Sequence, residues 1–192
     1  KWKGWTPTFM MGHRVNRKSL GIIGMGRIGQ ALAKRARGFD MQIHYHNRNR
    51  VDEKLESFLK ATYWKSLDNM LAHIDFLSIN CPKTRETYHL LNVDRLKLLK
   101  PHAIIINTAR GDIIDERALA ERLKIGAILG AGLDVYENEP TINPNLAELE
   151  NVVLMPHLGS ATYESRQAMG DKVIKNIVAF NAGCLSADLI IK

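Results

Sequence analysis

Three residues in the second half of the chain have the types that anion binding and proton transfer require: Arg110, Glu139 and His157. The planar guanidinium of an arginine can hold a carboxylate and polarise a carbonyl beside it. A histidine releases or accepts a proton near neutral pH, and an adjacent carboxylate favours its charged form. The ordinary alternatives are a surface ion pair for Arg110 and a structural role for His157. The combination of all three residues favours a chemical role.

A glycine-rich segment near the start of the chain has the spacing of a dinucleotide-binding loop: Gly24-Met25-Gly26-Arg27-Ile28-Gly29. It follows a predicted strand and opens a predicted helix, which is the context that makes this short pattern informative. Gly24 permits a tight turn, Gly26 lets the backbone approach a pyrophosphate, and Gly29 lets the helix pack closely on the strand. The helix N-terminus offers N–H groups to the phosphates, so Arg27 and Ile28 are also expected cofactor contacts. A simple strand-to-helix turn is the alternative.

The second predicted strand ends in a basic segment rather than an acidic one. Enzymes that bind NAD place Asp or Glu there to hydrogen-bond the ribose 2′-hydroxyl. This chain has Asn47, Arg48 and Arg50 instead, with no carboxylate before Asp52. The two arginines can hold the 2′-phosphate of NADP through charge-assisted hydrogen bonds. The sequence therefore predicts NADP as the cofactor, with NAD as the alternative cofactor and a solvated basic loop as the alternative interpretation.

Short apolar runs alternate with longer amphipathic segments, which is typical of βαβ units. Strands are predicted over 19–24, 41–46, 75–80, 103–107, 129–135 and 152–155. Helices are predicted over 27–38, 66–72, 92–99, 115–123 and 162–182, with Gly38 ending the first and with Ser66 and Asp115 capping two others. Three isoleucines over 104–106 indicate a strand buried on both faces. The expected fold class is α/β, a Rossmann-type doubly wound parallel sheet.

The composition is typical of a globular protein and argues against several other classes of protein. The 192 residues are 45% apolar and 24% charged, which is ordinary for a globular protein, and no apolar run is long enough to span a bilayer. The net charge of +7 is spread along the chain without a nucleic-acid-binding motif, so neither nucleic acid nor a membrane is an expected partner. Cys81 and Cys184 lack metal-ligand spacing, and the first five residues lack the apolar segment of a signal peptide. We therefore expect a cytoplasmic protein without a metal site.

Four segments resemble, in their order and spacing, the signatures of the D-2-hydroxyacid dehydrogenase family. They are residues 80–87 (NCPKTRET), 107–111 (NTARG), 133–140 (LDVYENEP) and 156–162 (PHLGSAT). The resemblance covers nearly the whole chain, from about residue 5 to residue 183. The glycine-rich segment, with His46-Asn47-Arg48 after it, is most similar to the branch of glyoxylate and hydroxypyruvate reductases. The resemblance implies an oxidoreductase that transfers a hydride between NADP(H) and a small 2-keto or 2-hydroxy acid.

The resemblance also implies a role for individual residues. Arg110 contacts the substrate, His157 is the general acid for reduction and the base for oxidation, and Glu139 pairs with His157. Glu137 is the rival carboxylate, but Glu139 stands directly before a proline and so matches the family position. Asp134 orients the nicotinamide carboxamide. The other expected cofactor contacts are Cys81, Pro82, Thr87, Thr108, Ala109, His157 and Gly159.

Family members usually have a second, substrate-binding domain, whose motifs are largely missing from this chain. We therefore expect the chain to be part of a longer protein, weakly active or inactive by itself because a closed, dry cleft cannot form. Residues 1–18, with Trp2, Trp5 and Phe9, are a predicted arm that contacts a second subunit of a homodimer. Residues 19–192, including the last helix, are the predicted NAD(P)-binding domain.

Other functions stay open at this stage. Within the family, the chain could act on phosphoglycerate, lactate or formate, because the missing domain holds most of what separates these enzymes. From a different class, the same fold serves as a nucleotide-sensing interaction module in transcriptional corepressors, some of which keep the same three site residues. A non-catalytic fragment kept only for oligomerisation is the third alternative.

Overall fold

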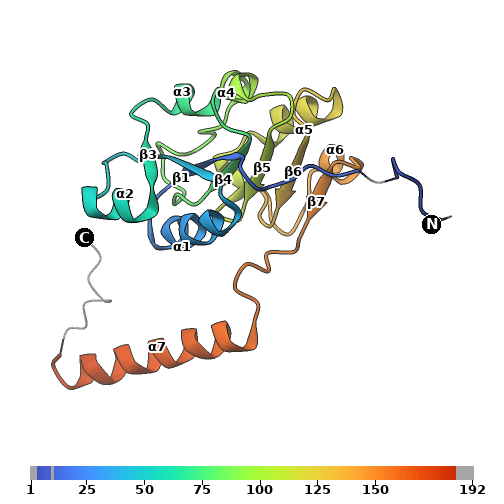
Figure 1. Ribbon diagram of the computed structural model, residues 1–192. Coiled ribbons are helices and arrows are strands. Elements are labelled where there is room, and N and C mark those ends of the chain that lie inside the picture. The colour runs from blue at the N-terminus through green and yellow to red at the C-terminus, as the bar shows by residue number, and fades with distance from the viewer. Residues whose placement is uncertain (1–3, 10, 185–192) are drawn as a thin grey trace. The chain divides into compact units, whose positions relative to one another are not determined.

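The computed structural model describes residues 4–9 and 11–184 of the chain (Figure 1). The chain divides into two compact units, residues 1–157 and residues 158–192. The first unit holds an entire β-sheet with its flanking helices, and the second holds a single helix in its described part. Trp2 lies outside the described residues, so its predicted dimer contact stays a prediction. The grouping of residues 19–192 into one domain also stays a prediction.

The first unit is built on a seven-stranded sheet with the order β3-β2-β1-β4-β5-β6-β7. Every pair of neighbouring strands is parallel. The strands are β1 (Ser19–Ile23), β2 (Gln42–His46), β3 (Ala61–Tyr63), β4 (Phe76–Ile79), β5 (Ile104–Asn107), β6 (Gly130–Leu133) and β7 (Val152–Leu154). The strand order reverses between β1 and β4, and doubly wound sheets bind ligands at the carboxyl ends of such strands. The predicted fold class is confirmed.

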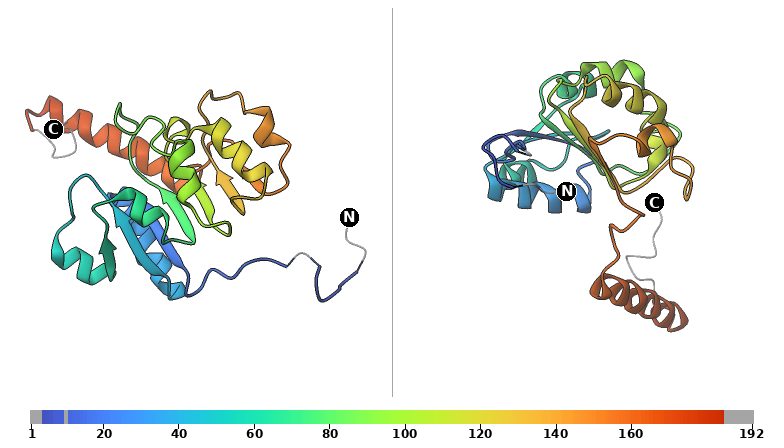
Figure 2. Two further views of the ribbon diagram at one scale, coloured as in Figure 1. Left: turned by 90° about the horizontal axis from the view of Figure 1, so that it is seen from above. Right: turned by 90° about the vertical axis from the view of Figure 1, so that its right-hand side faces the viewer.

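Helices cover both faces of this sheet, as the two further views also show (Figure 2). On one face lie α1 (Arg27–Ala36) and α2 (Glu53–Leu59). On the other face lie α3 (Leu67–Leu71), α4 (Val93–Leu98) and α5 (Glu116–Lys124). The four-residue helix α6 (Pro144–Ala147) contacts α5 and β7 at the sheet's end.

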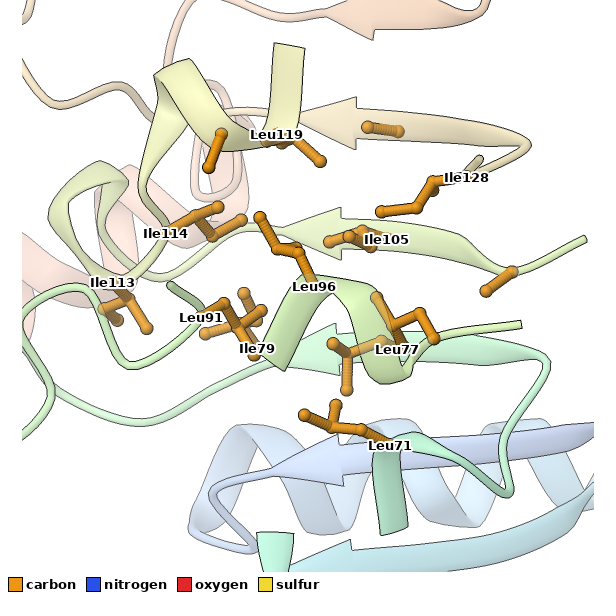
Figure 3. Packing of buried hydrophobic residues seen from close by; sticks show 14 of the residues in the cluster. Leu71, Leu77, Ile79, Leu91, Leu96, Ile105, Ile113, Ile114, Leu119 and Ile128 are labelled. Atoms are coloured by element: carbon orange, nitrogen blue, oxygen red, sulfur yellow. The ribbon is translucent and has the colours of Figure 1, made fainter. Parts of the chain in front are cut away.

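Each face has its own hydrophobic core. The larger one packs α3, α4 and α5 on the sheet (Figure 3), and its fully buried members include Leu71, Leu77, Ile79, Leu96, Ile105 and Leu119. The smaller core joins α1 and α2 to the first strands, through Ile22, Ala33, Ile43 and Leu59. Burial of one such large aliphatic side chain contributes about 1.5–3 kcal/mol. The sheet is therefore held rigidly, and the loops at its carboxyl edge start from fixed points.

All six predicted strands and all five predicted helices are present, close to their predicted limits. Two predicted caps are confirmed. The hydroxyl oxygen of Ser66 accepts a hydrogen bond from the N–H of Asn69 at 3.3 Å, and the Asp115 carboxylate accepts one from the N–H of Ala118 at 3.0 Å. Such caps satisfy N–H groups that the first turn of a helix leaves unpaired.

Three local predictions differ from the structure. The first helix does not end at Gly38, because a 3₁₀ helix (Arg37–Phe39) follows it and Asp40 adopts the left-handed conformation at φ 54°. Aspartate tolerates that conformation because its short polar side chain can bond locally. The helix α2 and the strand β3 were not predicted. A strand of three residues carries too little periodicity to recognise. The prediction that β5 is buried on both faces is wrong: Ile105 is buried, whereas Ile104 and Ile106 are half-buried.

The second unit contains α7 (Tyr163–Asn181), which begins where predicted. The hydroxyl of Thr162 accepts a hydrogen bond from the N–H of Ser165 at 3.1 Å and so caps the helix. The spacing of Met169, Val173, Ile177 and Phe180 places these apolar residues along one stripe of α7. Among the described residues, no helix is both long enough and apolar enough to cross a bilayer.

Candidate active site

The glycine-rich loop leaves the end of β1 and is closely packed on its inner side. Gly24 has a φ of 98°, and a Cβ there would lie 2.6 Å from the backbone nitrogen of Cys81. A Cβ on Gly29 would lie 2.2 Å from the carbonyl oxygen of Gly24. A Cβ on Gly26, in contrast, would have no neighbour within 4 Å. The loop is thus fixed from behind and open at Gly26, which fits the close approach of a pyrophosphate.

The start of α1 is prepared for an anion. No side chain caps this helix at Gly26, so the N–H groups of its first turn have no side-chain partner. The loop itself is held by Asn47, whose side-chain oxygen accepts a hydrogen bond from the N–H of Met25 at 2.7 Å. Unpaired N–H groups and the positive end of the helix dipole favour a phosphate at this place. The predicted residue Asn47 therefore lies at the loop, and its side chain holds the loop's backbone.

The two predicted arginines after β2 have different surroundings. Arg50 donates two hydrogen bonds to the Glu56 carboxylate, from Nε at 2.9 Å and from Nη2 at 2.6 Å. The hydroxyl of Tyr45 also donates to Glu56, and burial together with this bond raises the pKa of Tyr45 to about 12. The Arg50 hydrogen bond lowers the pKa of Glu56. Arg48 is exposed and forms neither a hydrogen bond nor an ion pair with other described residues, so its guanidinium is open to a ligand.

A groove of about 410 Å³ adjoins the glycine-rich loop at the carboxyl ends of β4 and β5. It is lined by Ile28, Asn80, Cys81, Pro82, Lys83, Thr108, Ala109 and Arg110. Thr87 fixes the loop after β4, because its hydroxyl donates to the carbonyl of Pro82 at 2.8 Å and accepts from the N–H of Thr84 at 2.7 Å. Burial raises the pKa of the Cys81 thiol to about 11, so this side chain stays protonated and largely apolar in the groove.

A second pocket, of about 610 Å³, lies beside this groove and contains the three residues from which chemistry was predicted. Its lining comprises Lys83, Arg110, Gly111, Asp112, Tyr136, Glu137, Asn138, Glu139 and His157. Arg110 and Lys83 line both spaces, so the pocket and the groove meet at these two side chains. The predicted trio is therefore brought together in one pocket, next to the groove.

One ion pair of this pocket joins Glu139 and His157, with 2.8 Å between His157 Nδ1 and Glu139 Oε2. Because a carboxylate can only accept, Nδ1 carries the hydrogen and Nε2 is left for another partner. The hydrogen bond from His157 lowers the pKa of Glu139. His157 has a φ of 55°, an uncommon conformation for a residue with a side chain, and such strain is concentrated at functional sites.

Backbone contacts hold this pair in place. The N–H of Tyr136 donates to the other oxygen of Glu139 at 3.1 Å. The hydroxyl of Tyr136 donates to the carbonyl of Met155 at 2.8 Å, which ties the loop after β6 to the end of β7 just before His157. Tyr136 thus links the two loops that supply the pair. The sequence analysis did not single it out, since a tyrosine after a strand is common.

Arg110 is positioned by a buried turn after β5. The side-chain amide of Asn107 donates to the carbonyl of Arg110 at 2.9 Å, and its oxygen accepts from the N–H of Ala109 at 3.1 Å. Asn107 is only 1% exposed, so its role is to shape this turn. Within the part of the chain that the structure describes, the Arg110 guanidinium bonds only to the backbone carbonyl of Ala109. No ion pair joins it to a carboxylate of the described residues, although its charge contributes to the lowered pKa of Glu139.

Two further ion pairs border the pocket, and neither was predicted. Lys83 Nζ lies 2.8 Å from Asp112 Oδ1. His89 Nε2 pairs with the carboxylate of Glu137, the residue considered as the rival of Glu139. Since Glu137 is engaged by His89, the structure brings Glu139 and not Glu137 to His157. Asp112 follows Arg110 by two positions, and that proximity is the signal that could have identified it.

Three other predicted cofactor residues do not line the groove. Asp134 is buried at the end of β6, where its N–H donates to the carbonyl of Asn107 at 3.0 Å. Arg27 is exposed at the start of α1. Gly159 belongs to the second unit, so its predicted contact with the cofactor stays a prediction. Among the described residues, no cluster of three or more His, Cys, Asp or Glu could hold a metal ion.

A glycine loop between β1 and α1, with a groove at the point where strand order reverses, defines a nicotinamide-dinucleotide-binding domain. Residues 1–159 match the family model described as "D-isomer specific 2-hydroxyacid dehydrogenase, NAD binding domain". The chain therefore belongs to the D-isomer specific 2-hydroxyacid dehydrogenase family. The predicted family is confirmed.

Individual relatives agree with this assignment. A glyoxylate reductase from Thermococcus litoralis is 47% identical over 196 residues, which cover 100% of this chain and 59% of the relative. A structure from a Polaromonas species, described as a D-isomer specific 2-hydroxyacid dehydrogenase, superposes with a TM-score of 0.93 at 44% identity and covers 99% of this chain and 59% of that one. The NADPH-dependent glyoxylate/hydroxypyruvate reductase from Sinorhizobium meliloti, in complex with NADP and malonate, gives 0.80 at 40% identity, with 85% and 50% covered. The chain thus spans less than two thirds of the length of these relatives.

Proposed function

We propose that this chain carries the cofactor site and the catalytic residues of an NADP(H)-dependent reductase of small 2-keto acids, with glyoxylate or hydroxypyruvate as substrate. The observation that supports the proposal most is the Glu139–His157 pair, which shares one pocket with an arginine that has no carboxylate partner among the described residues. The names of the relatives point to the same reaction.

Three side chains have different roles in the proposed reaction. Arg110 binds the carboxylate of the keto acid and polarises the carbonyl next to it, since its guanidinium has several N–H donors in a planar fork. Glu139 accepts the hydrogen of His157 Nδ1 and thereby orients the ring. Nε2 then gives its proton to the oxygen that becomes the hydroxyl, and the charged imidazole is stabilised by Glu139. In oxidation the same nitrogen accepts that proton.

A bound nicotinamide dinucleotide supplies the hydride in this proposal. Gly24, Gly26 and the N–H groups at the start of α1 hold its pyrophosphate. Cys81, Pro82, Thr108 and Ala109 border the groove that leads toward Arg110, and Asp134 is proposed for the nicotinamide amide. Keeping Cys81 as a neutral thiol leaves this part of the groove without a charge.

The preference for NADP is supported by the segment after β2. Arg48 forms no hydrogen bond or ion pair with the described residues, although its charge acts on Glu86, and Arg50 is held by Glu56 through Nε and Nη2. We therefore assign the 2′-phosphate chiefly to Arg48, with Arg50 as its fixed neighbour. The S. meliloti neighbour, which is described as NADPH-dependent, agrees with this preference.

The proposal is tested by titrating the chain with NADPH and with NADH, followed by nucleotide fluorescence. We expect tighter binding of NADPH, and Arg48→Ser should reduce that preference by about tenfold, the size of one charge-assisted hydrogen bond. Addition of glyoxylate should then cause slow oxidation of bound NADPH at high chain concentration. Tighter binding of NADH would contradict the cofactor preference, and no binding of either nucleotide would contradict the proposal as a whole.

The arm before β1 is the proposed contact between two copies of the chain. Its Trp5 and Phe9 side chains are 79% and 46% exposed in the first unit and so are available to a second copy. Trp5→Ser should shift the chain toward monomer in analytical ultracentrifugation. A wild-type chain that sediments as a monomer at all concentrations would contradict this part of the proposal.

A further inference from the structure

One ion pair lies at the junction of the groove and the pocket and has no part in the proposed reaction. It joins Lys83, in the loop after β4, to Asp112, two residues after Arg110. Lys83 and Arg110 are the two residues that line both spaces. Any substrate whose reacting carbon lies at this junction must therefore pass close to the pair.

Each carboxylate of the pocket has an ion-pair partner, but one of its cationic side chains has none among the described residues. Asp112 is paired with Lys83, Glu137 with His89, and Glu139 with His157. Arg110 is the cation of this pocket that lacks a carboxylate partner within the described part of the chain. Arg110 is thus the cationic side chain of this pocket that is left to bind a ligand carboxylate.

The Lys83–Asp112 pair affects how strongly the pocket binds a ligand that carries a second negative charge. With Asp112 at 2.8 Å, the ammonium of Lys83 is already neutralised and cannot fully compensate another anionic group. Asp112 itself repels such a group. Both side chains are partly in contact with solvent, at 50% and 20% exposure, so the effect is moderate rather than absolute.

We propose that the Lys83–Asp112 ion pair is a specificity-determining element that favours monoanionic 2-keto acids over dianionic ones at the Arg110 site. This inference rests on the proposed function, because it takes Arg110 as the residue that binds the substrate carboxylate. It adds a discrimination by charge that Arg110, Glu139 and His157 do not provide. The pair is local to the junction and does not touch the Glu139–His157 hydrogen bond.

The test uses two probes of nearly the same size, oxamate with one negative charge and oxalate with two. Each is titrated into the isotopically labelled chain, and binding is followed by the NMR signal of Arg110 Nε–H. The ratio of the two dissociation constants is compared among variants. Asp112→Asn should shift the ratio about fivefold toward oxalate, because Lys83 is released and a like charge is removed. Lys83→Met should shift it by a similar factor toward oxamate.

Opposite shifts are the decisive feature. A purely structural ion pair, once broken from either side, would disturb the pocket in the same direction in both variants. The double variant Lys83→Met/Asp112→Asn should return the ratio close to that of the wild type. Asp94→Asn breaks an exposed ion pair with Lys97 elsewhere in the chain and serves as the matched control with an unchanged ratio.

The possible results separate the two proposals. Binding of both probes with an unchanged ratio in both single variants contradicts the charge discrimination and leaves the proposed function intact. Shifts of the ratio in the same direction also contradict it. Failure of both probes to perturb Arg110 in the wild-type chain contradicts the assignment of Arg110 as the substrate-binding residue, and the inference falls with it.

Discussion

The amino ends and the carboxyl ends of the parallel strands form two opposite edges of the sheet, here called the amino edge and the carboxyl edge. Both edges carry charged side chains, but these side chains have different numbers of hydrogen-bond partners. At the amino edge, Asp75 accepts three hydrogen bonds, from the N–H of Ser19 at 2.9 Å, from His102 at 2.8 Å and from Lys100 at 3.1 Å, and is 13% exposed. At the carboxyl edge, Glu139 accepts two hydrogen bonds and is 36% exposed.

This difference separates a structural site from a chemical one. A buried carboxylate with a full set of donors stabilises the fold and has nothing left to offer a ligand. At the carboxyl edge, no side chain of the described residues caps the first turn of α1, no carboxylate pairs with the Arg110 guanidinium, and one nitrogen of His157 is left for another partner. Incomplete pairing next to a pocket is therefore the feature that marks the functional edge.

The largest effect is expected where the carboxyl edge depends on backbone fit rather than on charge. Gly29→Ala forces a Cβ to 2.2 Å from the Gly24 carbonyl oxygen, so α1 must move away from β1. We expect a loss of about 3 kcal/mol in the free energy of unfolding, measured by chemical denaturation. Gly26→Ala, whose Cβ has open space, should fold normally and lose affinity for NADPH. Equal stability losses in the two variants would contradict this account of the loop.

The next largest change in stability is expected for a substitution at the amino edge. Asp75→Asn removes a carboxylate whose side chain is only 13% exposed, and leaves Lys100 and His102 without their anionic partner. We expect the free energy of unfolding to fall by about 2 kcal/mol, with NADPH affinity unchanged. Asp94→Asn is the matched control, because its ion pair with Lys97 is exposed and should contribute less than about 0.5 kcal/mol. A change in NADPH affinity in Asp75→Asn would show that the two edges are coupled.

The same carboxylate predicts how stability depends on pH. Burial of Asp75 would raise its pKa, but the hydrogen bonds from the Ser19 N–H, His102 and Lys100 outweigh burial and hold the pKa well below its usual range. Because the folded pKa lies below the unfolded value, this stabilisation is present above about pH 4 and is lost as the pH falls toward the folded pKa. Wild-type stability should therefore drop between about pH 4 and pH 2 more steeply than that of Asp75→Asn. Parallel curves would rule out this role for Asp75.

The smallest change in stability is expected for the Glu139–His157 pair. Both side chains are partly exposed, so Glu139→Gln should alter the free energy of unfolding by less than about 1 kcal/mol. The hydrogen bond from His157 lowers the pKa of Glu139, and the small stabilisation it gives is lost as the pH falls below the ordinary glutamate range. A thermal shift assay over pH can measure it. A loss as large as that in Asp75→Asn would remove the distinction between the two edges.

Much of the carboxyl edge could be predicted from the sequence because its residues lie in short, ordered motifs. The glycine-rich loop and the position of Arg110 after β5 follow from local spacing, and the choice of Glu139 over Glu137 follows from the family resemblance. The pairings that depend on distant residues could not be predicted in this way. Glu56 holds Arg50, and Asn47 holds the glycine loop, through side chains brought together only by the fold.

The amino edge was not recognised at all. Asp75, Lys100 and His102 carry no motif, and they meet because β4 and β5 are neighbours in the sheet. The short strand β3 was not predicted for a related reason. It is defined by its pairing with β2 and not by the types of its own three residues. Tertiary pairing thus accounts for most of what the sequence analysis missed.

The most direct test of the central proposal, that the carboxyl edge is a reductase site, is the slow oxidation of NADPH with glyoxylate at high chain concentration, measured before and after His157→Asn. Asparagine keeps a hydrogen-bond donor for Glu139 but cannot serve as the acid. We predict a loss of about 10²- to 10⁴-fold in this rate, with folding and NADPH binding unchanged. An unchanged rate would contradict the account.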